Sequence, residues 1–137
     1  MLMFYHFKPR WLEYLEVMKN FKQLRIWQTG FTIALSSYKL IETFPKEERY
    51  EMTSQLNRAA LSVPLNIVEG CGRYTDKDFA HFLDNSLGSI NESDYCAYAA
   101  KELNYISEQE YNKVNNLVTE VRAMLIGFLK FLRTDKP

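Results

Sequence analysis

Asp78 and His81 place a carboxylate and an imidazole one helical turn apart, a spacing that can put two metal ligands on one helix face. Di-iron helical bundles use such an acid-x-x-His pair twice, together with two further inward carboxylates. The chain has 2 histidines, and the second one, His6, lies far away near the N-terminus. We therefore expect a solvated His81 and no metal site.

The 2 cysteines, Cys71 and Cys96, lack the Cys-x-x-Cys spacing of redox and zinc motifs. We expect Cys96 to fill the core as a small apolar side chain and Cys71 to be partly exposed. The stretch Gly70-Cys71-Gly72-Arg73 lacks the long glycine-framed run and the Lys-Ser or Lys-Thr end of a phosphate loop. No Ser-His-Asp arrangement is apparent either. The sequence thus predicts a protein that is not an enzyme and holds no cofactor.

Three basic side chains flank a glycine-containing turn in the middle of the chain. Arg58, Arg73 and Lys77 are candidates for phosphate contacts, and therefore for a nucleic-acid interface. The competing interpretation is architectural: Arg58 or Arg73 pairs with an acid and locks this corner or a subunit contact. The acids available for such a pair are Glu69, Glu92 and Asp94.

The overall charge gives a nucleic-acid partner little support. Basic and acidic residues number 17 each, so the formal net charge is +0. Residues 1–45 hold six basic and three acidic side chains, a net of +3, whereas residues 70–106 hold three and six, a net of −3. This is not the basic stripe of a strong nucleic-acid binder. No apolar run approaches the ~18 residues of a membrane span. With no signal peptide pattern at the start, we expect a cytoplasmic protein with reduced thiols.

Four long helical patterns account for most of the chain. Apolar side chains recur at three- and four-residue steps over residues 21–43, 45–69, 75–106 and 107–133. Pro64 predicts a kink inside the second pattern, and Gly70 predicts its end. Thr75 and the capping box that begins at Ser107 predict the starts of the last two helices.

Short connections between long helices force neighbouring helices to run antiparallel. The sequence therefore predicts an all-α protein, an up-down-up-down four-helix bundle over residues 21–137. Residues 1–20 are predicted to form a separate N-terminal extension that carries the pattern of a short amphipathic helix.

The third helical pattern predicts self-association. From Tyr95 to Ala100 it is apolar almost all round, which indicates burial on more than one side. We expect Tyr95, Tyr98 and Tyr105 to form an interface between copies of the chain. The alternatives are an exposed tyrosine-rich surface and a kink at Gly88-Ser89 that redirects the row of apolar side chains along the helix. The tyrosines could also stack on bases, although in helical bundles they more often pack cores and interfaces.

The segment from Gln55 to Gly70, followed by Gly72-Arg73 and by Gly88-Ser89-Ile90-Asn91-Glu92, closely resembles the 23S rRNA intervening-sequence family. The resemblance covers residues 21–133. It implies a bacterial four-helix bundle that assembles as a homopentamer and is not a known enzyme. It also implies a fold related to the accessory protein of diversity-generating retroelements, which binds nucleic acid.

One departure weakens that analogy, because the stretch Thr75-Asp76-Lys77-Asp78 is often basic in relatives. The sequence as a whole predicts a non-enzymatic homo-oligomer that accompanies RNA or DNA, and the family resemblance implies that it is a pentamer. The alternative is a scaffold that binds only protein, through residues 1–20 or the acidic middle region. Neither interpretation includes a membrane.

Overall fold

A computed structural model describes residues 20–134 of the chain. Within these residues every regular element is helical. In chain order they are the 3-10 helix η2 (Phe21–Gln23), α2 (Arg25–Ile41), the 3-10 helix η3 (Lys46–Glu48), α3 (Met52–Cys71), α4 (Asp76–Glu102) and α5 (Glu108–Arg133). The extension predicted over residues 1–20 lies outside the described residues except for Asn20, and so does its predicted helix.

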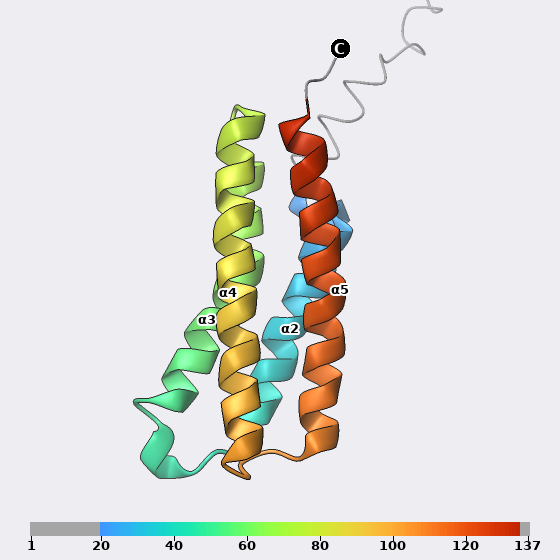
Figure 1. The fold of residues 1–137 in the computed structure, drawn as a ribbon. Helices are drawn as coiled ribbons and strands as arrows, with labels where there is room; N and C mark the ends of the chain where they lie inside the picture. The colour runs from blue at the N-terminus through green and yellow to red at the C-terminus, as the bar shows by residue number, and fades with distance from the viewer. Residues whose placement is uncertain (1–19, 135–137) are drawn as a thin grey trace, which may run out of the picture.

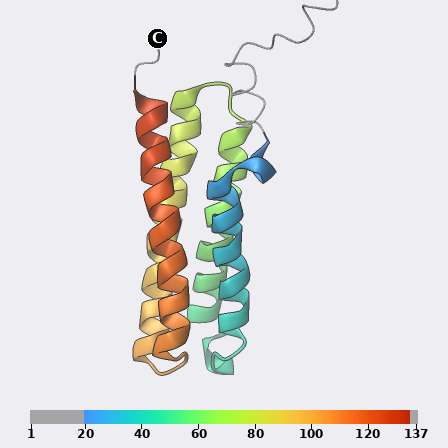
Figure 2. The same cartoon turned by 90° about the vertical axis from the view of Figure 1, so that its right-hand side faces the viewer.

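The long helices α2, α3, α4 and α5 form one bundle. Each of them runs opposite to the one before it (Figure 1), and the view turned by 90° shows the same order (Figure 2). Around the bundle, α2 packs against α3 and α5, and α4 packs against the same two helices. This confirms the predicted up-down-up-down four-helix bundle.

One apolar core runs the length of the bundle. Its largest fully buried side chains include Ile33, Leu56, Ile67, Leu83, Ile90 and Leu125. The side of α4 that faces the core carries small residues, Ser86, Ser93, Ala97 and Ala100, none of which has any exposed surface. Small side chains let the backbones of neighbouring helices approach each other closely. This stripe of small residues is therefore the buried face of α4.

The connection between α2 and α3 differs from the prediction of one helix over residues 45–69. Pro45 precedes the short helix η3, and α3 begins only at Met52. The Glu48 carboxylate accepts a hydrogen bond from the Met52 backbone N–H at 3.3 Å and another from the Tyr105 hydroxyl at 3.0 Å. This carboxylate thus ties the start of α3 to the turn after α4, which local periodicity does not reveal.

The end of α3 also corrects a prediction, because Gly70 does not terminate the helix. The helix continues to Cys71, and Gly72 caps it with an ordinary φ of −83°. A Cβ atom placed on Gly70 would lie 2.8 Å from Cδ1 of Phe79. Gly70 is therefore required for the close approach of α3 and α4, rather than for a left-handed turn.

The starts predicted for the last two helices are confirmed. The Thr75 side chain accepts a hydrogen bond from the Asp78 N–H, and Ser107 and Glu110 form a reciprocal capping box at α5. The end predicted near Ile106 is wrong, since α4 stops at Glu102. Asn104 adopts a left-handed φ of 62°, and the Tyr105 N–H bonds back to the Ala100 carbonyl at 2.8 Å. Asparagine tolerates this conformation and ends the helix there.

Candidate nucleic-acid interface and assembly surfaces

Two of the three predicted phosphate-binding residues lie together at the α3–α4 turn. The guanidinium of Arg73 sits 4.4 Å from the ring centroid of Phe82, which holds the cation over an aromatic face. Lys77 lies in the first turn of α4 and borders an open hollow of about 380 Å³. Both side chains belong to exposed residues. The cap at Thr75 fixes the backbone between them, so the turn presents two cations at one end of the bundle.

Arg58 lies apart from that pair. It is exposed on α3 thirteen residues before the end of the helix at Cys71, which corresponds to about 20 Å along the axis. It borders a separate hollow of about 400 Å³ with Tyr50, Gln55 and Glu92. The structure therefore does not bring Arg58 to the corner at which Arg73 and Lys77 meet.

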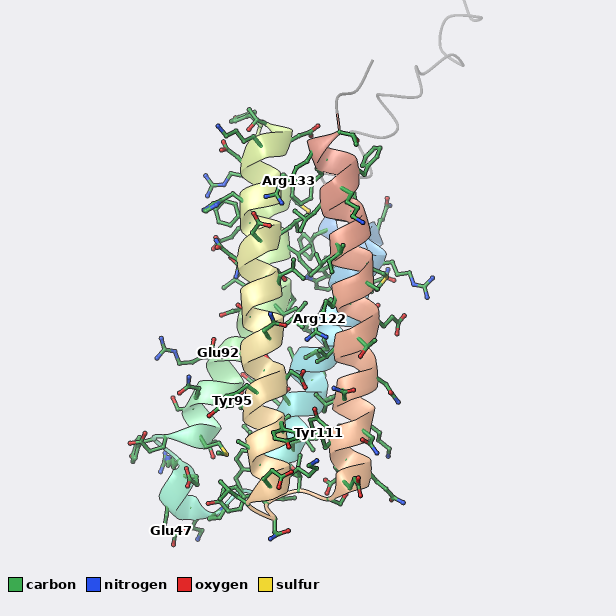
Figure 3. The ribbon with its side chains drawn as sticks, viewed as in Figure 1. Glu47, Glu92, Tyr95, Tyr111, Arg122 and Arg133 are labelled. Atoms are coloured by element: carbon green, nitrogen blue, oxygen red, sulfur yellow. The ribbon has the colours of Figure 1, made fainter. Side chains whose placement is uncertain are left out.

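The architectural alternative for the two arginines also receives no support within one chain. Among residues 20–134 the structure gives neither Arg58 nor Arg73 an ion pair with an acid. Asp94 instead accepts a hydrogen bond from the Tyr111 hydroxyl at 3.0 Å and lies 3.6 Å from Arg122. Tyr111 and Arg122 both lie between α4 and α5 in Figure 3. Asp94 thus joins α4 to α5, away from the α3–α4 turn.

Charge is distributed unevenly between the two ends of the bundle. The end with the α3–α4 turn carries Lys22, Arg25, Arg73, Lys77, Lys130 and Arg133, against Glu69, Asp76, Asp78 and Asp84. The opposite end carries Lys39, Lys46, Arg49, Lys101 and Lys113, against Glu42, Glu47, Glu48, Glu51, Glu102, Glu108 and Glu110. The first end is the more basic of the two, although the chain as a whole is neutral.

Among the cations that the structure describes at the basic end, Arg133 alone is held by a carboxylate in two hydrogen bonds. Its two terminal nitrogens donate to the two carboxylate oxygens of Asp84, one of them at 3.1 Å. These bonds raise the pKa of the guanidinium, which keeps it charged at any physiological pH. Figure 3 shows Arg133 at the upper end of α5, facing α4. The pair joins α4 to α5, whereas Arg73 and Lys77 form no ion pair within residues 20–134.

Five exposed apolar side chains of the described chain lie on α2 and α3. We call this surface the α2/α3 apolar face, and it consists of Phe31, Leu35, Tyr38, Leu61 and Leu65. Between 39% and 53% of the surface of each of these residues is exposed. Two stacked rings continue this face toward the start of α2, because Trp27 lies parallel to Phe31 with 5.1 Å between ring centroids.

Neighbouring contacts show that the two halves of this face adjoin. The helices approach closely at Gly30, where an added Cβ would lie 3.1 Å from the Val63 side chain. Phe31 follows Gly30, and Leu61 and Leu65 lie on either side of Val63. The opposite flank of α2 contacts α5 and the opposite flank of α3 contacts α4, so the apolar side chains share the outer surface over the α2–α3 pair.

Comparison with known proteins places the chain in a family. The profile of the 23S rRNA-intervening sequence protein family matches residues 22–127. The chain belongs to this family. Its fold is similar to a crystal structure from Bacteroides thetaiotaomicron, described as a protein of unknown function from the S23 ribosomal protein family, with a TM-score of 0.71 and 25% identity. The similarity covers 77% of this chain and 98% of that one. A comparison with curated proteins gives no match.

Residues of the segment from Gln55 to Gly70 pack α3 against its neighbouring helices. Pro64 remains inside α3 with its side chain buried, and the Ser86 hydroxyl donates to the neighbouring Val63 carbonyl at 2.8 Å. Gly70 allows Phe79 to pack against α3. These family residues hold α3 against α4 and Gly30 of α2, which is a structural role.

The three tyrosines predicted to form an interface have different surroundings. Tyr95 is 71% exposed and Tyr98 is 46% exposed, and Tyr98 packs edge-on against Tyr111. Tyr105 packs against Phe44 inside the monomer, with 5.7 Å between ring centroids. Its hydrogen bond to Glu48 raises its pKa. Tyr95 and Tyr98 thus remain available to another copy, whereas Tyr105 closes the lower end of its own bundle.

The cysteines and the histidine of the described chain lie either in the core or on the solvent-exposed surface. Cys71 is only 7% exposed, so the expectation that it is partly exposed is wrong, and burial raises the pKa of its thiol to about 11. Cys96 is buried in the core as predicted, and burial also raises the pKa of its thiol. His81 is exposed and packs edge-on against Phe82. Over residues 20–134 no cluster of His, Cys, Asp or Glu could hold a metal ion.

None of the described helices has the length and apolar character needed to cross a membrane.

Proposed function

We propose that this family member acts without catalysis, as a homo-oligomer whose copies assemble into a ring. The α2/α3 apolar face is the observation that carries this proposal. Exposed apolar side chains of this size, gathered on one surface, are typical of a protein interface. The number of five copies rests on the family resemblance described above.

A closed ring joins two different surfaces, because each copy meets its two neighbours through opposite sides. The α2/α3 apolar face supplies one surface. Tyr95 and Tyr98 lie on α4, diagonally across the bundle from α2, and supply a second surface. We propose that the α2/α3 apolar face of one copy packs against the α4 tyrosines of the next.

The mass of the full chain in solution tests the assembly. Light scattering during size-exclusion chromatography should give a multiple of 16.2 kDa at micromolar concentration. Leu35→Lys places a charge on the α2/α3 apolar face and should reduce the mass to a single chain while the helical circular dichroism is unchanged. Ile126→Lys is the matched control, because Ile126 is similarly exposed at 42% but lies on α5. A single-chain mass for the unsubstituted protein would refute the proposal.

We also propose that the ring contacts RNA at the end that carries the α3–α4 turn. The exposed cations Arg73 and Lys77 support this proposal, because cations grouped at one end of each copy become a basic surface when copies assemble around an axis. Arg58 is a more remote phosphate contact in this arrangement. Each phosphate contact makes binding more sensitive to salt.

The RNA contact is tested with nucleic-acid-free protein and labelled structured or single-stranded RNA, at about 50 to 200 mM salt. The double variant Arg73→Ala/Lys77→Ala should weaken binding and lower the slope of log K against log salt by about 1.5, and Arg58→Ala should have a smaller effect. Arg49→Ala at the acidic end is the control. No binding at the lowest salt would favour the alternative function, a scaffold that binds only protein.

A further inference from the structure

The surface between α2 and α5 contains an apolar hollow of about 350 Å³, here called the α2/α5 hollow. Its lining residues are Leu24, Arg25, Ile26, Met124, Gly127, Phe128 and Phe131. A cavity of about 150 Å³ already accepts a benzene ring. The α2/α5 hollow is therefore large enough for an aromatic side chain, and it lies on a different side of α2 from the α2/α3 apolar face.

Gly127 gives the hollow its open floor. A Cβ atom placed on Gly127 would have no heavy atom of the described chain within 4 Å. Nothing there excludes a larger side chain, in contrast to Gly70, where a Cβ would meet Phe79 at 2.8 Å. Glycine is a poor helix former, and Gly127 lies well inside α5. Its presence at this position suits a neighbour that packs against the bare backbone.

The chain supplies such a neighbour directly before the described residues. A helical projection places Trp11, Leu12, Tyr14, Leu15 and Met18 on one face of the segment Trp11–Met18. The two glutamates of the segment fall on the other side of this projection. Such a segment needs an apolar surface to cover its face.

The point at which the described chain begins brings the segment to the hollow. Asn20 is followed at once by η2, and Leu24, four residues later, lines the hollow. A helical segment from residue 11 to residue 18 is about 10 Å long, and one residue, Lys19, separates it from Asn20. The segment can therefore reach the hollow of its own bundle without spanning any other part of the molecule.

We propose that residues 11–18 of the same chain dock in the α2/α5 hollow, with the Trp11 side chain over Gly127. The extension is then an integral fifth element of the bundle. It covers the α2–α5 side of each copy and leaves the α2/α3 apolar face open. This inference does not depend on the proposed assembly or on RNA binding.

Trp11 fluorescence in the full-length chain tests the docking. Trp27→Phe leaves Trp11 as the only tryptophan. Its emission should be blue-shifted relative to the urea-denatured chain, and acrylamide should quench it several-fold less. Adding Gly127→Leu, which fills the hollow, should shift the emission toward that of the denatured chain. Gly88→Leu is the matched control and should leave the spectrum unchanged, because a Cβ on Gly88 also meets nothing within 4 Å but lies on α4.

Three outcomes overturn the proposal. In the first, native Trp11 fluoresces as it does in urea, and in the second, a shielded Trp11 does not respond to Gly127→Leu. In the third outcome, the shielding disappears when Leu35→Lys reduces the protein to single chains, which would mean that a second copy supplies the segment. If Trp11 stays shielded in Leu35→Lys protein that is a single chain, the segment docks within its own chain, whatever the outcome for RNA.

Discussion

Replacing Gly70 by alanine tests the close contact between α3 and α4. The new Cβ would lie 2.8 Å from Cδ1 and 3.1 Å from Cε1 of Phe79, and 3.2 Å from Cβ of Phe82. The Phe79 ring cannot easily move away, because it is 5% exposed and packs edge-on against Phe128 with 5.5 Å between ring centroids. Overpacking of this kind costs about 2–3 kcal/mol where the neighbours are fixed.

The substitution also has a favourable component, since alanine is better than glycine inside a helix by about 1 kcal/mol. The sum predicts that Gly70→Ala lowers the free energy of unfolding by about 1–2 kcal/mol. Gly88→Ala is the matched control, because it gains the same helix propensity in α4 with no atom within 4 Å of the new Cβ. It should raise the free energy of unfolding by up to about 1 kcal/mol.

Urea titrations followed by circular dichroism at 222 nm measure both changes. All proteins should be compared at one protein concentration, because assembly adds a concentration-dependent contribution to stability. Equal m-values would show that the substitutions change stability and not the denatured state. If Gly70→Ala proved as stabilising as Gly88→Ala, the reasoning that assigns Gly70 to helix packing would be refuted.

Three further predictions concern buried hydroxyls, the Cys71 thiol and the pH dependence of stability. Ser86→Ala removes a buried hydroxyl that donates to an α3 carbonyl, so it should destabilise by about 1 kcal/mol, whereas Ser37→Ala removes a buried hydroxyl with no partner in the described chain and should stabilise by about as much. Alkylation at pH 8 should be slow for native Cys71, because burial raises its pKa to about 11, and fast after denaturation. The raised pKa values of Cys71 and Tyr105 mean that the folded state holds these two protons more tightly than the unfolded state does. The contribution of these two groups to the free energy of unfolding is therefore fully present below pH 9 and is lost as the pH rises toward 11. In urea titrations at increasing pH, Tyr105→Phe should make the free energy of unfolding fall less steeply at the upper end of this range.

Local signals in the sequence predicted the starts of α4 and α5 correctly. Thr75 and Ser107 bond to backbone groups three residues ahead, so every atom in each cap lies within one turn of the same chain segment. The end of α4 was predicted too late, although Asn104 carries a recognisable signal for a left-handed cap. Gly70 was misjudged because a glycine serves equally well in a turn or in a close helix contact, and only the position of Phe79 distinguishes the two.

Candidate surfaces were harder to predict than helices. Arg58 and Arg73 are close in the sequence motif, yet a continuous helix separates them by about 20 Å along its axis. The sequence predicts that Tyr105 shares an interface with Tyr98, but the left-handed Asn104 turns the chain so that Tyr105 packs inside its own monomer. A helical projection cannot anticipate the turn before Tyr105, because it assumes that the helix continues, whereas the separation of Arg58 from Arg73 follows from the length of α3.

The sequence by itself determined the four helices, their antiparallel order and the family, because periodicity, caps and motif residues act within short segments. Only the tertiary structure decided which outer flanks adjoin. Phe31 and Leu35 of α2 become one surface with Leu61 and Leu65 of α3 because the two helices meet at Gly30 and Val63. Residues thirty positions apart become neighbours through packing alone, and the proposed assembly surface exists only in the folded bundle.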